Sequence, residues 1–235
     1  IVIVPSNYVK RKLEGSGVQV EAVIPHGVRL YSHPRDEKSV IYGYVADWSL
    51  RKYPVYGVKA ILLAGIKLKV ITTYDNPILY LFDPVKVKNK IFFTVNIGKR
   101  LFFCSRSVPM SDERLWNFYS SIGFYLNISD AEGFGLTPLE AMSAGAVPIC
   151  PTLPAYKGVL PKWIPWVRTH NNPWLEDGGW CFIEHWPYSP HDMIKICALA
   201  EELSDSTYAH LSRKCYEYSL KFDINNVYRK CLAFL

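Results

Sequence analysis

The sequence predicts an α/β protein with a doubly wound parallel β-sheet and helices on both faces. Short apolar runs typical of buried strands alternate with amphipathic stretches typical of helices along most of the 235 residues. Strands joined through helices lie parallel, because each crossover returns the chain to the same end of the sheet. The composition agrees with a globular chain, since 49% of the residues are hydrophobic and 20% are charged.

Strands are expected where apolar residues, many of them β-branched or aromatic, form runs, and helices where apolar residues recur at helical spacing. Ser6 and Ser111 are suited to cap two of the helices, and Pro138 and Gly145 mark the start and end of a third. The expected strands are 1–4, 18–24, 40–46, 68–73, 91–95, 100–104, 124–128 and 147–150. The expected helices are 6–15, 54–64, 111–121, 138–144, 191–203 and 207–222.

Charge and composition narrow the function classes. The net charge of +6 is diffuse, which favours a phosphorylated small molecule or peripheral contact with an anionic membrane and argues against nucleic acid. No run reaches the roughly 18 apolar residues that span a bilayer, and no signal peptide is recognised. The six cysteines form no C-x-x-C pair, so neither a zinc site nor a redox pair is indicated. We therefore expect a cytoplasmic protein.

The run DAEGFGLTPLEAMSAG, residues 130–145, carries the strongest chemical signal. It follows a predicted strand, and a glycine-rich turn before a helix leaves free N–H groups that bind phosphate. Gly133 and Gly135 let the backbone approach such a phosphate closely. A carboxylate accepts two hydrogen bonds from a vicinal diol, which suits Glu140 to a ribose and Glu132 to sugar hydroxyls. Two diols bridged by a diphosphate describe a nucleotide sugar.

The same run resembles the nucleotide-sugar signature of retaining family 4 glycosyltransferases, which have the GT-B fold. Glu132 and Glu140 match the family's spacing of two glutamates with seven residues between them. The resemblance implies a Rossmann-like domain of GT-B type in which Glu132 orients the donor sugar and Glu140 holds the ribose. It implies no cofactor and no metal, and the sequence has no Asp-x-Asp. The other donor-binding residues that it implies are Gly133, Phe134, Gly135, Leu136, Thr137, Ser129 and Gly27.

The phosphate clamp departs from the family pattern. The family places an arginine and a lysine after the strand that corresponds to 40–46, and Lys52 fits the lysine. Asp47 stands where the arginine is expected. Arg51 is the substitute, because a guanidinium can bind phosphate oxygens with two parallel hydrogen bonds. Arg51 and Lys52 would neutralise the charge that develops on the leaving diphosphate.

The resemblance also predicts the domain organisation. Residues 1–24 correspond to a remnant of the interdomain region, and residues 25–235 to the donor-binding domain. The acceptor-binding half, which supplies a glycine-rich loop and a catalytic-site histidine in the family, has no counterpart. Because Ile1 is not a residue that ordinary removal of an initiator methionine leaves first, the sequence is expected to begin inside a longer protein.

The tryptophan-rich segment 161–180 holds four tryptophans and has three interpretations. It could be an acceptor platform, an aromatic mini-core, or an interface with a partner domain or a second copy of the chain. The five histidines outside the His26–Gly27 turn have no ligand spacing, and we assign them no site role; they are His33, His170, His185, His191 and His210.

The sequence therefore predicts a retaining glycosyltransferase that moves a sugar, expected to be a hexose, from a nucleoside-diphosphate sugar to an unknown acceptor. Two alternatives remain open at this point. One is a non-catalytic nucleotide-sugar-binding module or a subunit that needs a partner domain. The other is a nucleotide-sugar epimerase, a class that shares the architecture.

Overall fold

The computed structural model describes residues 1–31, 34–45, 51–52, 54–71, 111–179 and 182–234. Within them, five parallel strands form the main sheet in the order β4-β3-β5-β6-β7. The chain passes from β3 to the edge strand β4, then returns to the central strand β5 and continues through β6 to the other edge. The strands are β3 (Ile41–Val45), β4 (Lys67–Ile71), β5 (Phe124–Leu126), β6 (Val147–Pro151) and β7 (Trp166–Val167).

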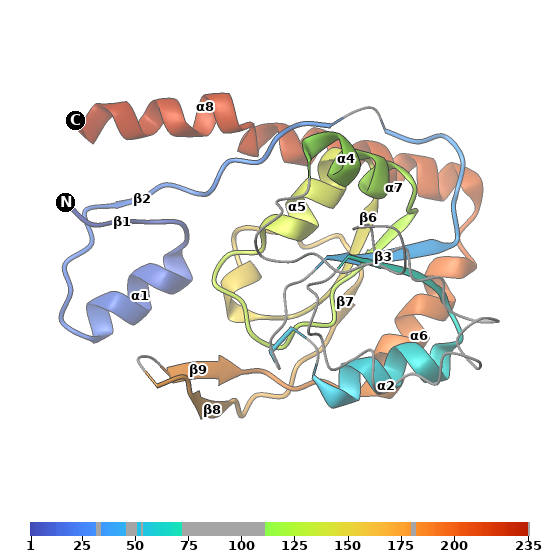
Figure 1. Cartoon of the computed structure of the whole chain (residues 1–235), viewed down its shortest axis with the longest axis horizontal. Helices are drawn as coiled ribbons and strands as arrows, with labels where there is room; N and C mark the ends of the chain where they lie inside the picture. Colours follow the sequence, from blue (N-terminus) through green and yellow to red (C-terminus); the bar gives the residue numbers. More distant parts are fainter. Residues whose placement is uncertain (32–33, 46–50, 53, 72–110, 180–181, 235) are drawn as a thin grey trace.

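Helices cover both faces of this sheet. Figure 1 shows α4, α5 and α7 on one side, with α2 and α6 together on the other. This arrangement confirms the predicted α/β class with a parallel sheet and helices on both faces. The helices are α2 (Val55–Ala64), α4 (Asp112–Ser120), α5 (Leu136–Ser143), α6 (Pro190–Glu201) and α7 (Asp205–Ser219), with 3-10 turns at Pro154–Tyr156, Leu220–Phe222 and Lys230–Phe234.

The N-terminal residues lie beside the main sheet and not in it. Strands β1 (Ile3–Val4) and β2 (Ala22–Val23) pair in parallel around helix α1 (Asn7–Gly15). The chain then crosses the C-terminal segment, where α8 (Ile224–Arg229) begins. The Val28 N–H donates to the Phe222 carbonyl at 2.7 Å, and the Ile224 N–H donates to the Val28 carbonyl at 3.0 Å.

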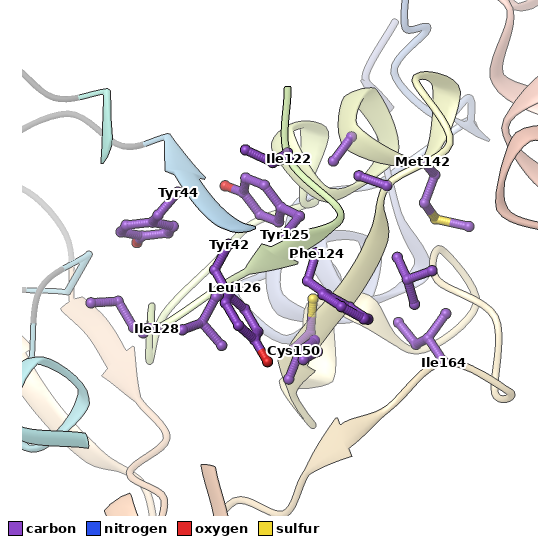
Figure 2. Close-up of a cluster of buried hydrophobic side chains, with 14 of the residues drawn as sticks. Tyr42, Tyr44, Ile122, Phe124, Tyr125, Leu126, Ile128, Met142, Cys150 and Ile164 are labelled. Atoms are coloured by element: carbon purple, nitrogen blue, oxygen red, sulfur yellow. The ribbon is translucent and has the colours of Figure 1, made fainter. Parts of the chain in front are cut away.

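The core is rich in tyrosine. Phe124, Tyr125 and Leu126 of β5 are fully buried at its centre, and Figure 2 shows them beside Tyr42 and Tyr44 of β3. A buried hydroxyl needs a partner, and these tyrosines find theirs in backbone carbonyls. Such bonds fasten loops to the core: they run from Tyr44 to Lys52, Tyr42 to Cys197, Tyr125 to Val45, Tyr188 to Ile128 and Tyr208 to Gly123.

The expected elements correspond closely to the observed ones. The Ser6 and Ser111 hydroxyls accept from the N–H groups of Val9 and Arg114, as predicted for helix caps. The expected strands at 91–95 and 100–104 lie outside the described residues. In the C-terminal part, an antiparallel hairpin of β8 (Trp174–Asp177) and β9 (Phe182–His185) was not predicted.

The tryptophan-rich segment divides into packed and exposed parts. Trp163 lies against Tyr218 and Trp166 against Tyr156, as the mini-core interpretation requires. Trp174 on β8 is half-exposed, and Trp180 lies outside the described residues. Among the helices that the structure describes, none has the length and apolar character needed to cross a membrane.

Candidate functional site

A cavity of about 430 Å³ opens at the carboxyl ends of β3 and β5. It brings together three parts of the chain that are distant in sequence: Arg51 and Lys52 after β3, the signature loop 129–135 with the start of α5, and residues of the N-terminal part. Two of these parts were predicted to meet, because carboxyl ends of neighbouring parallel strands share one edge. The lining is Pro5, Val9, His26, Val45, Arg51, Lys52, Glu132, Gly133, Phe134, Gly135, Leu136 and Thr137.

The signature loop and the start of α5 line this cavity from Glu132 to Thr137. Gly135 is the N-cap of α5, has φ of +100°, and leaves the helix without a side-chain cap. The ring of Tyr156 lies against it, and a Cβ at Gly135 would stand 2.4 Å from a ring carbon. Position 135 therefore requires glycine for both its conformation and its space. The first turn of α5 is left open to an anion.

The two basic residues meet Glu132 at the cavity wall. Lys52 Nζ pairs with Glu132 Oε1, and Arg51 Nη1 lies 3.9 Å from Glu132 Oε2. Arg51 also donates to the Ala131 carbonyl at 3.2 Å. The side chains of Lys52 and Glu132 are 13% and 9% exposed, so the pair is largely withdrawn from water. Asp47, which stands at the expected arginine position, lies outside the described residues.

Three predicted binding residues, Ser129, Gly27 and Glu140, are absent from the lining of this cavity. Ser129 is fully buried, and its hydroxyl donates to the carbonyls of Arg51 and Ala131 at 3.0 Å each. Its contribution is to hold the two loops together. Gly27 is packed against the C-terminal segment, where a Cβ would stand 2.6 Å from Ile224 Cα. Glycine at 27 is explained by this crossing of two backbones.

Glu140 also lies outside that lining, one turn further along α5. Its Oε2 accepts a hydrogen bond of 2.7 Å from the Tyr119 hydroxyl. Burial raises the pKa of the Glu140 carboxyl, and the bond from Tyr119 opposes that rise. The Glu140 carboxylate is partly withdrawn from water and one of its oxygens is hydrogen-bonded to Tyr119. Its other oxygen can accept a hydrogen bond from a further donor.

The raised pKa of Glu140 gives a stability prediction. Above the ordinary pKa of 4.5, the unfolded chain releases this proton before the folded chain does, so the folded state loses relative stability as pH rises. Glutamine keeps an oxygen that accepts from Tyr119 but has no proton to lose. As pH rises through and above 4.5, Glu140→Gln should gain stability relative to the unmodified chain. Urea unfolding at a series of pH values measures this, and a constant difference would contradict it.

One histidine has a role that sequence spacing did not reveal. His185 of β9 is 1% exposed and lies between two carboxylates. Its Nδ1 is 2.7 Å from Asp130 Oδ1, and its Nε2 is 2.7 Å from Glu176 Oε2. The Trp174 ring stacks on the imidazole at 3.9 Å. Since 55 residues separate Asp130 from His185, only the tertiary fold brings them together.

Among the described residues, no three histidine, cysteine, aspartate or glutamate side chains gather so as to hold a metal ion. The charge at the cavity comes from the side chains of Arg51, Lys52 and Glu132 and from the first turn of α5.

This sheet order, with a glycine-rich loop before α5, is a Rossmann-like domain of GT-B type, and the solved structures that share it are GT-B glycosyltransferases. HepE from Anabaena in complex with UDP and glucose superposes with a TM-score of 0.70 at 16% identity, covering 100% of this chain and 62% of that one. The GtfA/B complex superposes with a TM-score of 0.66 at 15% identity, covering 99% of this chain and 44% of that one.

The sequence is also similar to viral proteins. "Putative glycosyltransferase ORF313" of Acidianus filamentous virus 1 is 26% identical over 159 residues, which are 66% of this chain and 48% of that protein. "Putative glycosyltransferase 48" of Sulfolobus islandicus filamentous virus is 24% identical over 99% of this chain and 69% of its own length. In the first of these matches, the chain spans about half the length of its relative. No family model matches the chain.

Proposed function

We propose that the chain is the donor-binding half of a retaining glycosyltransferase of the family 4 type. The observation that carries this proposal is the cavity in which Arg51, Lys52 and the open start of α5 face one another across the signature loop. Two cations and a helix N-terminus around one space suit a diphosphate. The viral relatives bear glycosyltransferase names, and HepE was solved with UDP and glucose, which supports the same class of donor.

In the proposed reaction, the sugar leaves a nucleoside diphosphate and joins an acceptor with its anomeric configuration retained. Lys52, Arg51 and the first-turn N–H groups of α5 stabilise the negative charge that grows on the leaving diphosphate. Glu132 orients the donor sugar near its reacting carbon, and Glu140 holds the ribose. Because basic groups and a helix N-terminus supply the positive charge, the proposal includes no metal.

The Lys52–Glu132 ion pair has a consequence for donor binding. Without ligand, the ammonium group of Lys52 is engaged by the carboxylate of Glu132. An arriving diphosphate competes for that ammonium group and frees Glu132 to accept hydrogen bonds from sugar hydroxyls. The pair therefore keeps both side chains in place at the cavity until the donor binds.

The remaining parts of the proposal concern the whole protein. We place the boundary between the interdomain remnant and the donor-binding domain at residue 24, and we place the protein in the cytoplasm. The acceptor-binding half belongs to a partner domain or subunit; the GtfA/B neighbour is itself a complex. Donor hydrolysis by the isolated chain would favour an enzyme that is active alone. Donor binding without turnover that a second protein restores would favour the subunit.

The test of donor binding compares ligands with and without phosphates. Calorimetry with UDP, GDP and ADP should identify a binding nucleotide, and the matching nucleoside should bind more weakly. Arg51→Ala should weaken binding of the diphosphate by roughly tenfold, because a charge-assisted hydrogen bond is lost. It should change nucleoside binding little. Arg168→Ala, at an exposed arginine away from the cavity, is the control. Equal losses for both ligands would mean that Arg51 does not contact the phosphates.

A further inference from the structure

The strongest unassigned feature is the buried connection between the hairpin β8–β9 and the signature loop. The side chains of His185 and Asp130 are each 1% exposed and meet at 2.7 Å. On the outer side, the His185 ring faces Glu176, whose side chain is 33% exposed, and it is covered by Trp174. The imidazole therefore connects Glu176 on the hairpin to Asp130 in the interior of the domain.

Asp130 is joined to the cavity through its backbone. Its N–H donates to the Arg51 carbonyl at 3.0 Å, and its carbonyl accepts from the Trp186 N–H at 2.8 Å. Glu132 follows two residues later. Any shift of Asp130 therefore moves both the loop that carries Arg51 and the loop that carries Glu132.

The Asp130 carboxylate has two partners that fix its orientation. One oxygen faces His185, and the other accepts from the Tyr56 hydroxyl of α2. Burial raises the pKa of this carboxyl, while the bonds from Tyr56 and His185 lower it. A buried carboxylate that lost one of these donors would be left with unsatisfied charge and would rearrange.

We propose that His185 is a positioning residue for the diphosphate site: by holding Asp130, it keeps the Arg51 and Glu132 loops at the spacing that binds the donor. The proposal rests on the proposed function for its ligand. Glu176 and Trp174 are not among the residues that line the cavity, so these two hairpin residues act on the site through His185. A buried second layer of hydrogen bonds serves in this way to lock the groups that contact a ligand.

Two substitutions at His185 separate the inner bond from the outer one. Asparagine can place its amide nitrogen near the position of Nδ1, so His185→Asn keeps the donor to Asp130 and loses the bond to Glu176. Glutamine reaches the position of Nε2, so His185→Gln keeps the bond to Glu176 and loses the donor to Asp130. Both variants lose the stacking on Trp174, which makes them a matched pair.

The first measurement is UDP affinity by calorimetry. His185→Gln should weaken UDP binding by roughly tenfold or more, and His185→Asn by no more than about threefold. Uridine binding should change little in either variant. Equal UDP affinities for the two variants would overturn the proposal. If the unmodified chain binds none of UDP, GDP and ADP, the proposed class of donor is contradicted, and the second measurement alone decides the positioning role.

The second measurement needs no ligand. Amide hydrogen exchange in residues 130–135 should be faster in His185→Gln than in His185→Asn, because only the first frees Asp130. Asp130→Asn is a further variant of nearly unchanged shape, in which one accepting oxygen becomes a donor and a bond from Tyr56 or His185 is lost. It should also show faster exchange. Exchange that is the same in all three variants and the unmodified chain would overturn the proposal.

Discussion

Lys52→Ala should lower the free energy of unfolding by about 3 kcal/mol and nearly abolish nucleoside-diphosphate binding. The stability loss follows because Glu132, with a side chain 9% exposed, would lose its nearest cation and keep only Arg51 at 3.9 Å. The cavity is open to water on one side, so we expect the low end of the range for buried pairs. Binding is lost because the ammonium group is the most withdrawn cation at the site. Urea unfolding and calorimetry with UDP measure the two effects.

The double variant Lys52→Ala/Glu132→Ala serves as the control for stability. Removing both partners leaves neither of these two charges unpaired, so the loss of stability in the double variant should be smaller than the sum of the two single losses. Arg51→Ala should cost less than Lys52→Ala, since the Arg51 side chain is 30% exposed and makes the longer contact. If the loss of stability in the double variant equals the sum of the losses in Lys52→Ala and Glu132→Ala, the ion pair is not the cause of those losses.

Gly135→Ala should destabilise the protein by about 2 to 5 kcal/mol and remove donor binding. A φ of +100° is strained for any residue with a Cβ, and the added methyl group would stand 2.4 Å from a Tyr156 ring carbon. Tyr156 is fully buried and has no room to retreat, so the loop must shift. The shift would misplace the first-turn N–H groups of α5. Thermal unfolding and UDP calorimetry measure these losses.

Gly133→Ala is the matched control in the same loop. Gly133 is exposed, and a Cβ there would meet nothing within 4 Å. The free energy of unfolding of Gly133→Ala should stay within about 0.5 kcal/mol of that of the unmodified chain. A large loss of stability in Gly133→Ala together with a small loss in Gly135→Ala would mean that Tyr156 does not hold the loop.

Much of this structure could be predicted from the sequence because its signals are local. The signature run predicted the position of α5 and the part of the cavity lining from Glu132 to Thr137, since a glycine turn and a helix start are encoded within a few residues. Lys52 and Glu132 were both expected at the donor site, but the ion pair between them was not predicted. The strands expected at 91–95 and 100–104 stay predictions.

Contacts between residues that lie far apart in sequence could not be predicted in this way. His185 has no neighbour at ligand spacing, and its partner Asp130 reads as an ordinary loop residue. The hairpin was missed because its alternating residues lie within a stretch dominated by tryptophan and proline. Buried tyrosines carry no local sign of which carbonyl their hydroxyls reach. Gly27 was assigned to the donor site, whereas its packing against Ile224 is visible only in the fold.

The crossing of Val28 over the C-terminal segment has a mechanical consequence. Two separate stretches of backbone, around Val28 and around Ile224, pass the same point and are tied by hydrogen bonds on both sides of Val28. A single strand would allow rotation about its own axis, whereas two strands side by side allow bending and resist twisting. The N-terminal part is thereby attached to the rest of the domain at a point where two backbone stretches, and not one, are held together.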